Sequence, residues 1–182
     1  MSKKVLVPIA QGTEEMEAVI IIDMLRRAGV KVIVAGENNI ITCSRGVKII
    51  PDKYFSDIEA DDTFDAIVIP GGKEGTEILC DNESFQDILK HHNKREGLIG
   101  AICAAPTILS DLKVLKADTK VTSHPSVRAV FNPNNYSENS VVVSDRYITS
   151  RGAGTAFDFA LQLIETLTDS DMADKIKNDI VL

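Results

Sequence analysis

Cys103 is the residue of this sequence with the clearest potential for chemistry, because of the segment around it. It lies in Gly100–Pro106, after the apolar pair Leu98 and Ile99 and before Thr107–Leu109, which can continue as a helix. A strand, a turn of small residues and a helix start in succession form an elbow that lifts a side chain out of a sheet. A helix start also favours a thiolate over a thiol, so we expect a nucleophilic, ionised sulfur.

The alternative interpretation of Cys103 is structural. A cysteine among alanine and isoleucine is commonly a small, buried apolar residue. Pro106 fits the elbow, because in the first turn of a helix its missing N–H leaves no hydrogen bond unmade. Strings of this kind are common in α/β proteins, so the local pattern leaves both interpretations open.

Glu17 is an acid on the apolar face of a predicted helix over 14–28. On a 3.6-residue wheel, Ile21, Met24 and Ala28 share its face. A buried carboxylate is costly unless it is paired, and desolvation raises its pKa, so we expect Glu17 to stay protonated near neutral pH. A protonated Glu17 can donate a hydrogen bond to a thiolate or pass a proton to a substrate oxygen.

The alternative for Glu17 is a first-turn acid that interacts with the helix dipole and reaches solvent. That interpretation suits Glu14 and Glu15 better than Glu17. The pattern therefore favours a site role for Glu17, since perturbed acids gather at functional sites.

Two other segments could meet Cys103 at one edge of a parallel sheet. Gly71 and Gly72 follow an apolar run, where glycine lets backbone approach a ligand and frees an amide for an oxyanion. His124 precedes Pro125, which holds it extended, and it is a candidate general acid or base. The plain alternatives are a strand-to-loop turn for the glycines and an ordinary loop position for His124.

Apolar runs of strand length alternate with helix-period segments along the whole chain. This alternation is typical of one doubly wound α/β domain over residues 1–182, with a mostly parallel sheet covered by helices on both faces. The predicted strands are Lys4–Ile9, Lys31–Ala35, Ala66–Ile69, Leu98–Ile102, Lys120–Thr122 and Tyr147–Thr149. The predicted helices are Glu14–Ala28, Ser84–Asn93, Ala104–Leu112, Gly154–Thr168 and Ser170–Asn178. A small antiparallel hairpin over Ile40–Ile50 is predicted at the sheet edge, and Gly29 is predicted to close the first helix.

Composition narrows the function classes further. The chain has 182 residues, 44% of them hydrophobic, which suits one domain that buries about 70% of its unfolded surface. Its net charge of -7, without an extended basic run, argues against nucleic acid or an anionic membrane as a partner. The start of the chain does not resemble a signal peptide, and no segment is long and apolar enough to span a membrane, so we expect a cytoplasmic protein.

Neither the cysteines nor the histidines have the spacing of a bridge or a metal site. Three cysteines without paired spacing indicate reduced thiols rather than a disulfide framework. His91 and His92 are adjacent, so they cannot share a helix face, and His124 has no second ligand at a zinc-like spacing. We therefore expect no metal.

Taken together, these strings resemble the ThiJ/PfpI superfamily, in the branch of the parkinsonism-associated protein deglycase. The similarity extends over essentially the whole chain. The matching segments are Glu14–Glu17, Met24–Gly29, Val34–Gly36, Cys43–Arg45, Pro70–Gly72, Ala101–Ala104, His124–Pro125, Tyr136–Asn139 and Thr149–Gly152.

The resemblance implies a flavodoxin-like three-layer sandwich that forms a homodimer. It implies that Cys103 is the reactive cysteine, with Glu17 as a protonated acid beside it and His124 nearby. The backbone amides of Gly72 and Ala104 match oxyanion-type donors, and Gly71 is expected to line the same pocket.

The resemblance also implies roles for residues farther from the sulfur. Arg45 and Arg151 match basic residues that line the pocket or the adjacent dimer contact. Cys43 matches a secondary, modifiable cysteine, whereas Ile50 replaces the interface cysteine of the animal protein. Modification chemistry at position 50 is therefore not expected here.

Members of the superfamily are assigned glutathione-independent glyoxalase and deglycase activity on methylglyoxal, glyoxal and their adducts, giving lactate or glycolate without a cofactor. They are also assigned roles as oxidative-stress sensors and redox-regulated chaperones, in which the same cysteine becomes a sulfinic acid and client proteins are bound. Both functions need the same activated sulfur, so the sequence leaves both open. A cysteine peptidase is a weaker alternative, because the protease branch has histidine directly after the nucleophile, where this chain has Ala104.

Overall fold

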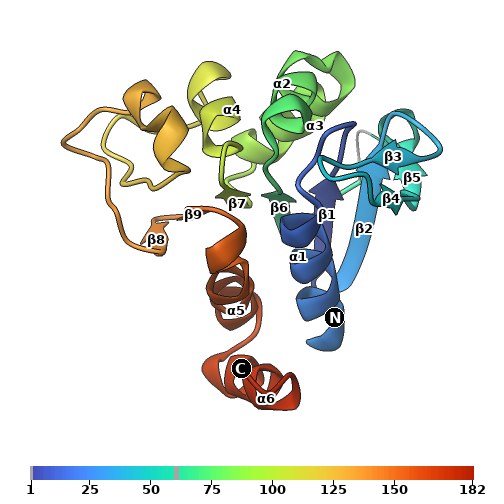
Figure 1. The fold of residues 1–182 in the computed structure, drawn as a ribbon, viewed down its shortest axis with the longest axis vertical. Helices are drawn as coiled ribbons and strands as arrows, with labels where there is room; N and C mark the ends of the chain where they lie inside the picture. The colour runs from blue at the N-terminus through green and yellow to red at the C-terminus, as the bar shows by residue number, and fades with distance from the viewer. Residues whose placement is uncertain (1, 60–61) are drawn as a thin grey trace.

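A seven-stranded sheet forms the middle layer of the computed structural model, which describes residues 2–59 and 62–182 (Figure 1). The strands are β1 (Lys4–Pro8), β2 (Lys31–Gly36), β5 (Lys53–Tyr54), β6 (Ala66–Ile69), β7 (Leu98–Ile102), β8 (Val141–Ser144) and β9 (Tyr147–Ser150). Their spatial order is β5-β2-β1-β6-β7-β9-β8, and every neighbouring pair is parallel except β8 with β9.

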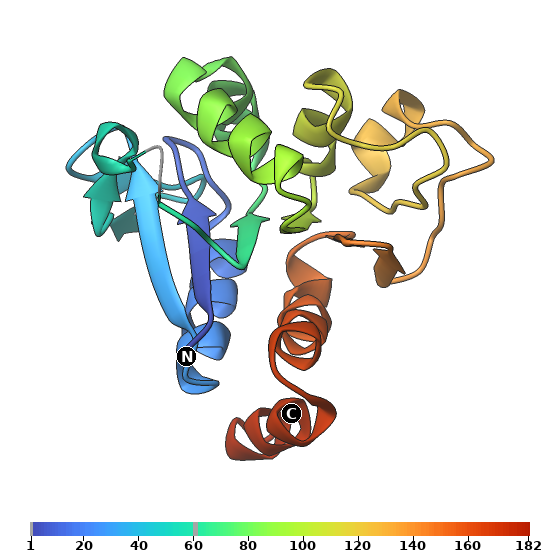
Figure 2. The ribbon, with the colours of Figure 1, turned by 180° about the vertical axis from the view of Figure 1, so that it is seen from behind.

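Helices cover both faces of this sheet, as the sequence predicted. They are α1 (Glu15–Arg27), α2 (Lys73–Asp81), α3 (Glu83–Lys94), α4 (Pro106–Asp111), α5 (Ala156–Leu167) and α6 (Ser170–Asp179), with 3-10 turns η1 (Phe55–Asp57), η2 (Pro125–Val130) and η3 (Ala153–Thr155). In Figures 1 and 2, α2, α3 and α4 lie above the strands; α1 and α5 pack on the other face, and α6 lies beyond α5. The predicted three-layer α/β sandwich is therefore confirmed.

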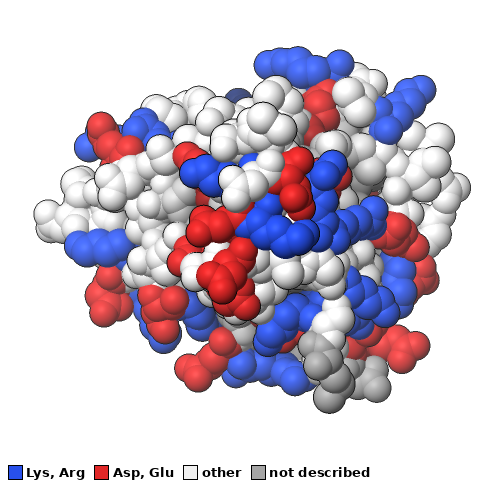
Figure 3. Space-filling model, turned by 90° about the horizontal axis from the view of Figure 1, so that it is seen from below, with Lys and Arg blue, Asp and Glu red and all other residues white. Residues whose placement is uncertain are grey.

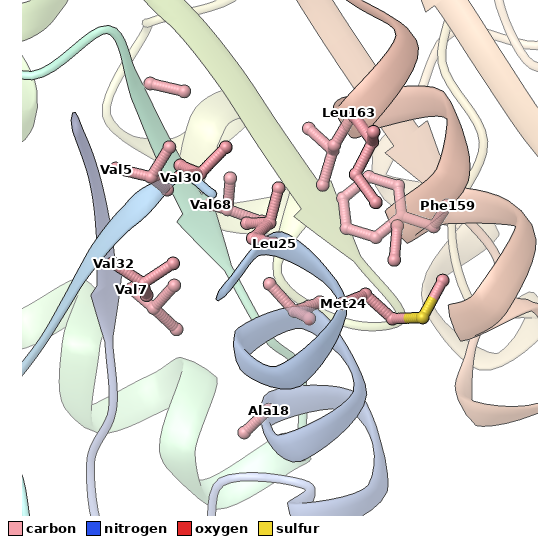
Figure 4. Packing of buried hydrophobic residues seen from close by; sticks show 14 of the residues in the cluster. Val5, Val7, Ala18, Met24, Leu25, Val30, Val32, Val68, Phe159 and Leu163 are labelled. Carbon is pink, nitrogen blue, oxygen red and sulfur yellow. The ribbon is translucent and has the colours of Figure 1, made fainter. Parts of the chain in front are cut away.

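The central strands are apolar on both faces because both faces are covered. Val5 and Val7 of β1 face the layer of α1 and α5, whereas Leu6 between them faces the layer of α2 to α4. Figure 4 shows Met24 of α1 and Phe159 of α5 directed into the first of these clusters. Both are at most 1% exposed, so the two helices are fixed against the sheet by close packing.

Helix α1 follows β1 and begins at the edge of the sheet where the site lies. Gly29 after it has φ +76°, the left-handed conformation that ends helices, as predicted. Arg26 and Arg27 occupy the last turn and Glu15 and Glu17 the first, which suits the helix dipole at both ends. Residues within α1 and directly after it therefore account for where the helix begins and ends. Its first turn lies next to the loops that follow the parallel strands.

The predicted hairpin at Ile40–Ile50 forms, but not at the edge of the main sheet. β3 (Ile41–Thr42) and β4 (Lys48–Ile49) pair antiparallel as a separate two-stranded sheet. The edge beside β2 is occupied instead by β5, which the sequence did not predict. The hairpin lies against the loop after β1, where the amide of Gly12 donates to the carbonyl of Thr42 at 2.9 Å.

The predicted strand at Lys120–Thr122 is wrong as a member of the sheet. Within the described residues, Val121 makes one isolated bridge, to Tyr136. The amide of Thr122 donates to the side-chain oxygen of Thr149 at 2.9 Å rather than to a backbone carbonyl, so no ladder continues beside β9. β8 pairs with β9 at that edge, and this strand and α2 were not predicted.

Charged side chains of both signs are spread over the surface, as expected from a sequence without an extended basic run. On the face shown in Figure 3, lysine and arginine are mixed with aspartate and glutamate over much of the surface. Opposite charges at this spacing screen each other, so this face offers no continuous basic surface to a polyanion. Among the described ranges, no helix has the length and apolar character needed to cross a membrane.

Candidate active site

Cys103 occupies a strained elbow directly after β7. Its φ is 64°, a left-handed value that residues with a β-carbon rarely adopt. The backbone is held there from two sides, because the Cys103 amide donates to the carbonyl of Ser150 at 3.0 Å and its carbonyl accepts from the amide of His124 at 2.7 Å. Pro106 begins α4 three residues later, as predicted. The elbow places the sulfur at the end of the sheet, in a partly buried position.

Glu17 is fully buried in the first turn of α1 and faces the elbow. Its Oε2 accepts the amide hydrogen of Gly71 at 2.8 Å, and within the described residues its Oε1 has no hydrogen-bond partner. Burial raises the pKa of this carboxyl to about 7, against the opposing effects of hydrogen bonds from Gly71 and Cys103. The prediction of a core-facing acid with a raised pKa is confirmed.

The pKa of Cys103 was predicted to be low, and this is wrong. Burial and the negative charge of Glu17 raise the pKa of the thiol to about 12, although the amides of Gly72 and Ala104 lower it. The prediction relied on the helix start and on a protonated Glu17 as hydrogen-bond donor, but α4 has only six residues, and the burial of the sulfur together with the charge of Glu17 outweighs both. The two acids titrate as a pair, in which Glu17 is the acceptor placed to take the thiol proton.

Gly71 and Gly72 make this close approach sterically feasible. A β-carbon at position 71 would lie 2.5 Å from the β-carbon of Cys103 and 2.7 Å from Oε2 of Glu17, so only glycine fits. Gly72 has φ +93°, and a β-carbon there would lie 2.3 Å from the carbonyl oxygen of Gly12. The Gly71 amide is used by Glu17, which leaves the amides of Gly72 and Ala104 directed to the sulfur.

His124 lies across the site from Glu17 and has a defined tautomer when neutral. Its Nδ1 accepts the backbone amide of Ser126 at 3.2 Å and lies 2.7 Å from the Ser126 hydroxyl. A backbone amide can only donate, so in the neutral ring Nε2 carries the hydrogen. A β-carbon at Gly152 would lie 3.6 Å from Cδ2 of His124 and 3.9 Å from Oε1 of Glu17, which places both side chains beside the same glycine.

These groups line one cavity of about 470 Å³. Among the predicted site residues it is lined by Cys103, Glu17, His124, Gly72, Ala104 and Arg45. Residues not predicted to belong to the site also line it, namely Gly12, Glu14, Ser44, Lys73, Glu74, Ser126 and Ala153. Most of them could have been found in the sequence because they are close to a predicted site residue. Lys73 and Glu74 follow the two glycines, Ser44 precedes Arg45, and Ser126 is two residues after His124.

Three predicted residues are not part of the cavity wall. Gly71 was expected to line it, but its amide is bound to Glu17 and its backbone does not form part of the wall. Arg151 donates from its guanidinium to the backbone carbonyl of Glu138 at 2.7 Å and is not part of the cavity wall; its other predicted position, at a dimer contact, stays a prediction. Cys43 is only 4% exposed, and burial together with the charges of Glu15 and Glu14 raises the pKa of its thiol to about 11. In this conformation Cys43 is inaccessible to modifying reagents.

No group of three or more histidine, cysteine, aspartate or glutamate side chains in the described ranges is arranged to hold a metal ion. The chemistry that the cavity offers is therefore that of a thiol, a buried carboxyl, an imidazole and backbone amides, and this combination supports nucleophilic catalysis.

A comparison with models of protein families identifies the family of this chain. A model of the DJ-1/PfpI family matches residues 3–166. The chain belongs to this family.

Individual DJ-1/PfpI relatives match over the full length. Protein dj-1beta of Drosophila melanogaster is 41% identical over 186 residues, which cover 100% of this chain and 98% of that protein. The glutathione-independent glyoxalase DJR-1.2 of Caenorhabditis elegans is 37% identical over 184 residues, which cover 100% of this chain and 96% of that protein.

A solved structure described as Toxoplasma gondii DJ-1, oxidized, superimposes with a TM-score of 0.95 at 40% identity and covers 99% of this chain and 98% of that chain. Together with the sheet order and the two helix layers, this similarity confirms the predicted flavodoxin-like fold of the DJ-1/PfpI family.

The pH dependence of Cys103 alkylation tests the coupling within this DJ-1/PfpI site. In the wild type, the rate with iodoacetamide is expected to rise with an apparent midpoint at pH about 7, where Glu17 becomes able to accept the thiol proton. Glu17→Gln cannot accept that proton, so alkylation then depends on ionisation of the buried thiol itself. The midpoint should therefore move upward, although loss of the Glu17 charge lowers the pKa of that thiol relative to the wild type.

Mass spectrometry of the Cys103 peptide between about pH 5 and about pH 10 measures this profile. Cys80→Ala in both backgrounds serves as the control for labelling elsewhere. An unchanged midpoint in Glu17→Gln would show that the carboxyl does not govern the thiol.

Proposed function

We propose that this DJ-1/PfpI protein is a glutathione-independent glyoxalase that converts methylglyoxal to lactate and glyoxal to glycolate. The observation that carries the proposal is Cys103 in a strained elbow, beside a buried Glu17 with a pKa of about 7, in an accessible cavity. A base with a pKa near the working pH is well matched to proton transfer. The glyoxalase DJR-1.2 at 37% identity supports the same activity.

The first step is attack of the Cys103 sulfur on the aldehyde carbon of methylglyoxal. A carbon–sulfur bond forms, the carbonyl π electrons move to oxygen, and the thiol proton passes to Glu17. The amides of Gly72 and Ala104, which face the sulfur, then stabilise the new alkoxide. Protonation of that oxygen gives a hemithioacetal.

The second step moves a hydrogen between the two substrate carbons. A base removes the C1 proton to give an enediol, and reprotonation at C2 gives the thioester of lactate. Oε1 of Glu17 and the imidazole of His124 both lie near Gly152, and we assign these proton transfers to them. Nε2–H of the neutral His124 serves as the donor to a substrate oxygen.

Hydrolysis of the thioester completes the cycle. Water adds to the thioester carbon, the carbon–sulfur bond breaks, and the Cys103 thiol and lactate are released. The reaction is an internal redox isomerisation followed by hydrolysis, so it balances without a cofactor or a metal. For deglycase activity on early adducts, Cys103 displaces the protein thiol or amine from the same carbon, and the Cys103 proton leaves with that group.

A second candidate function uses the same sulfur as an oxidation sensor. It is favoured by the relative described as Toxoplasma gondii DJ-1, oxidized. Two equivalents of peroxide would convert the Cys103 thiol to a sulfinic acid, with two waters formed. The amides of Gly72 and Ala104 and the carboxyl of Glu17 are placed to hydrogen-bond the new oxygens. In this role the oxidised protein binds client proteins as a redox-regulated chaperone.

A homodimer is proposed as the assembled form, and the exposed apolar side chains of α1 and the hairpin support it. Met16 and Val19 are three residues apart on α1 and are 55% and 48% exposed. Ile50, just after β4, is 74% exposed and lines one groove with Val19. Large exposed apolar groups that gather in one area are typical of a protein interface.

The remaining partner predictions follow from the same chemistry. A small dicarbonyl is the proposed substrate, and neither nucleic acid nor a membrane is proposed as a partner. The cytoplasmic location stays a proposal that rests on the three unbridged cysteines and on a reaction that needs a reduced thiol.

Removal of the sulfur tests the glyoxalase. Cys103→Ala should lower the formation of lactate from methylglyoxal by about a hundredfold or more in buffer without glutathione, because the covalent intermediates are lost. Cys80→Ala, in α2 and outside the cavity, should keep wild-type activity. Chiral analysis of the lactate is the measurement, since an enzyme-held enediol is protonated on one face. A wild-type protein that makes no lactate above the uncatalysed rate would exclude the enzyme.

Mild peroxide tests the sensor. Intact and peptide mass spectrometry should show gain of two oxygens at Cys103 and at neither Cys43 nor Cys80, because Cys43 is sealed and Cys80 lies outside the cavity that Cys103 shares with Glu17. Glu17→Leu should reduce that gain, since it removes the proton acceptor. Equal oxidation at all three cysteines would count against a sensor role.

A charge within the apolar patch tests the dimer. Ile50→Lys should shift the mass measured by light scattering toward the 19.8 kDa of one chain, because burial of an ammonium in an apolar interface is costly. Val130→Lys, at an exposed apolar position on η2, is the matched control and should keep the wild-type mass. A wild-type protein that is already monomeric would overturn the proposal.

A further inference from the structure

The turn that joins the two hairpin strands forms one wall of the cavity, and the buried carboxylate of Glu15 accepts both of its amide bonds to α1, while the Ser44 hydroxyl is shared between Glu15 and Glu14 at 2.8 Å each. Ser44 and Arg45 of this turn line the cavity with Cys103. We infer that Glu15 is the positioning residue that clamps the turn of residues 43–47 onto α1, which aims Arg45 at the substrate and keeps Cys43 sealed. The part of this inference that concerns substrate rests on the proposed glyoxalase function.

Glu15 accepts from three donors of the turn. Its Oε1 accepts the backbone amides of Arg45 at 2.8 Å and Val47 at 3.4 Å, and its Oε2 accepts the hydroxyl of Ser44 at 2.8 Å. The residue is 6% exposed although it is charged. Burial alone would raise its pKa, but hydrogen bonds from its own amide and from the turn outweigh it and hold the pKa below the usual range.

The geometry explains why an acid of this length is needed. Both amides are directed to Oε1 of Glu15, and in these part-buried bonds the loss of the acceptor costs free energy. The Ser44 side of the turn has a further backbone bond to the loop after β1, since the amide of Ser44 donates to the carbonyl of Thr13 at 2.9 Å. Without Glu15, the Arg45–Val47 half of the turn keeps only its internal bonds, such as Cys43 with Val47.

Two consequences follow for the site. The clamp fixes the backbone of Arg45, whose guanidinium forms no ion pair with any described residue and is therefore available to a substrate oxygen. The same clamp closes the turn over Cys43, which lies at its first position and is 4% exposed. Opening of the clamp should therefore weaken substrate binding and expose a second thiol together.

Two substitutions of Glu15 distinguish a clamp on the turn from a residue that acts only as a negative charge at the start of α1. Glu15→Asp keeps the negative charge in the first turn of α1 but is one methylene too short to reach the turn. Glu15→Gln loses the charge but keeps an oxygen for the amides of Arg45 and Val47, while its NH2 can donate to the Ser44 hydroxyl. If Glu15 acts as a clamp, Glu15→Asp should open the turn and Glu15→Gln should keep it closed. If Glu15 acts only through the helix dipole, the two variants should have the reverse effects.

The first readout is alkylation of Cys43, followed by mass spectrometry with Cys80 as an internal reference. Glu15→Asp should raise the Cys43 labelling rate about tenfold or more, and Glu15→Gln should stay within about twofold of the wild type. Glu83→Asp, in the exposed first turn of α3, is the matched control and should leave Cys43 sealed. An equal rise at Cys43 and Cys80 would indicate general unfolding and overturn the clamp, as would Glu15→Gln opening the turn while Glu15→Asp leaves it closed.

The second readout is the kinetics with methylglyoxal. Glu15→Asp should raise KM about tenfold with kcat within about twofold, because one charged hydrogen bond to substrate is misplaced while Cys103 and Glu17 are untouched. Arg45→Ala should raise KM equally without exposing Cys43, and the double variant should be no worse than Arg45→Ala. An additive double variant would overturn the link to Arg45, and a wild type without glyoxalase activity would refute the proposed function while the labelling result still decides the clamp.

Discussion

The site depends on the burial of one carboxyl beside one thiol. Glu17 has lost its hydration at the start of α1, and the energetic cost appears as a pKa near 7. The same burial and charge raise the pKa of Cys103, so the pair resists a second ionisation. In the proposed reaction, the sulfur is therefore activated by Glu17 as a local proton acceptor rather than by a low pKa of its own, and Glu17 keeps the proton for later steps.

The close approach of Glu17 and Cys103 requires a residue without a side chain next to both of them. Gly71 supplies an amide to Glu17 and leaves space for Cys103, and a β-carbon there would contact both. The strained φ of Cys103 is maintained by bonds to Ser150 and His124, which come from two other segments at the same end of the sheet. The strain is thus balanced by the parallel sheet, because its strand order brings these segments together.

Periodicity in the sequence predicted what is local. The buried position of Glu17, the elbow at Cys103 and the left-handed Gly29 all follow from patterns within one helix turn or one loop, and the structure agrees with each. The thiol pKa was misjudged because it depends on how deeply the folded chain buries the sulfur and on the charge of Glu17, 86 positions away, which was expected only as a protonated donor. The strand expected at Lys120–Thr122 failed for a similar reason, since its pairing is decided by the side chain of Thr149.

The two proposed functions, turnover of a dicarbonyl and oxidation by peroxide, both use the sulfur of Cys103 and therefore compete for it. In both proposed functions the sulfur of Cys103 is the nucleophile, and a carbonyl carbon or a peroxide oxygen has to reach it from the cavity, because the glycine loop and Glu17 pack against its other side. A hemithioacetal would occupy the sulfur only while substrate is bound, whereas oxidation to a sulfinic acid would remove the nucleophile irreversibly. If both proposals hold, a high concentration of dicarbonyl should therefore protect the thiol from peroxide.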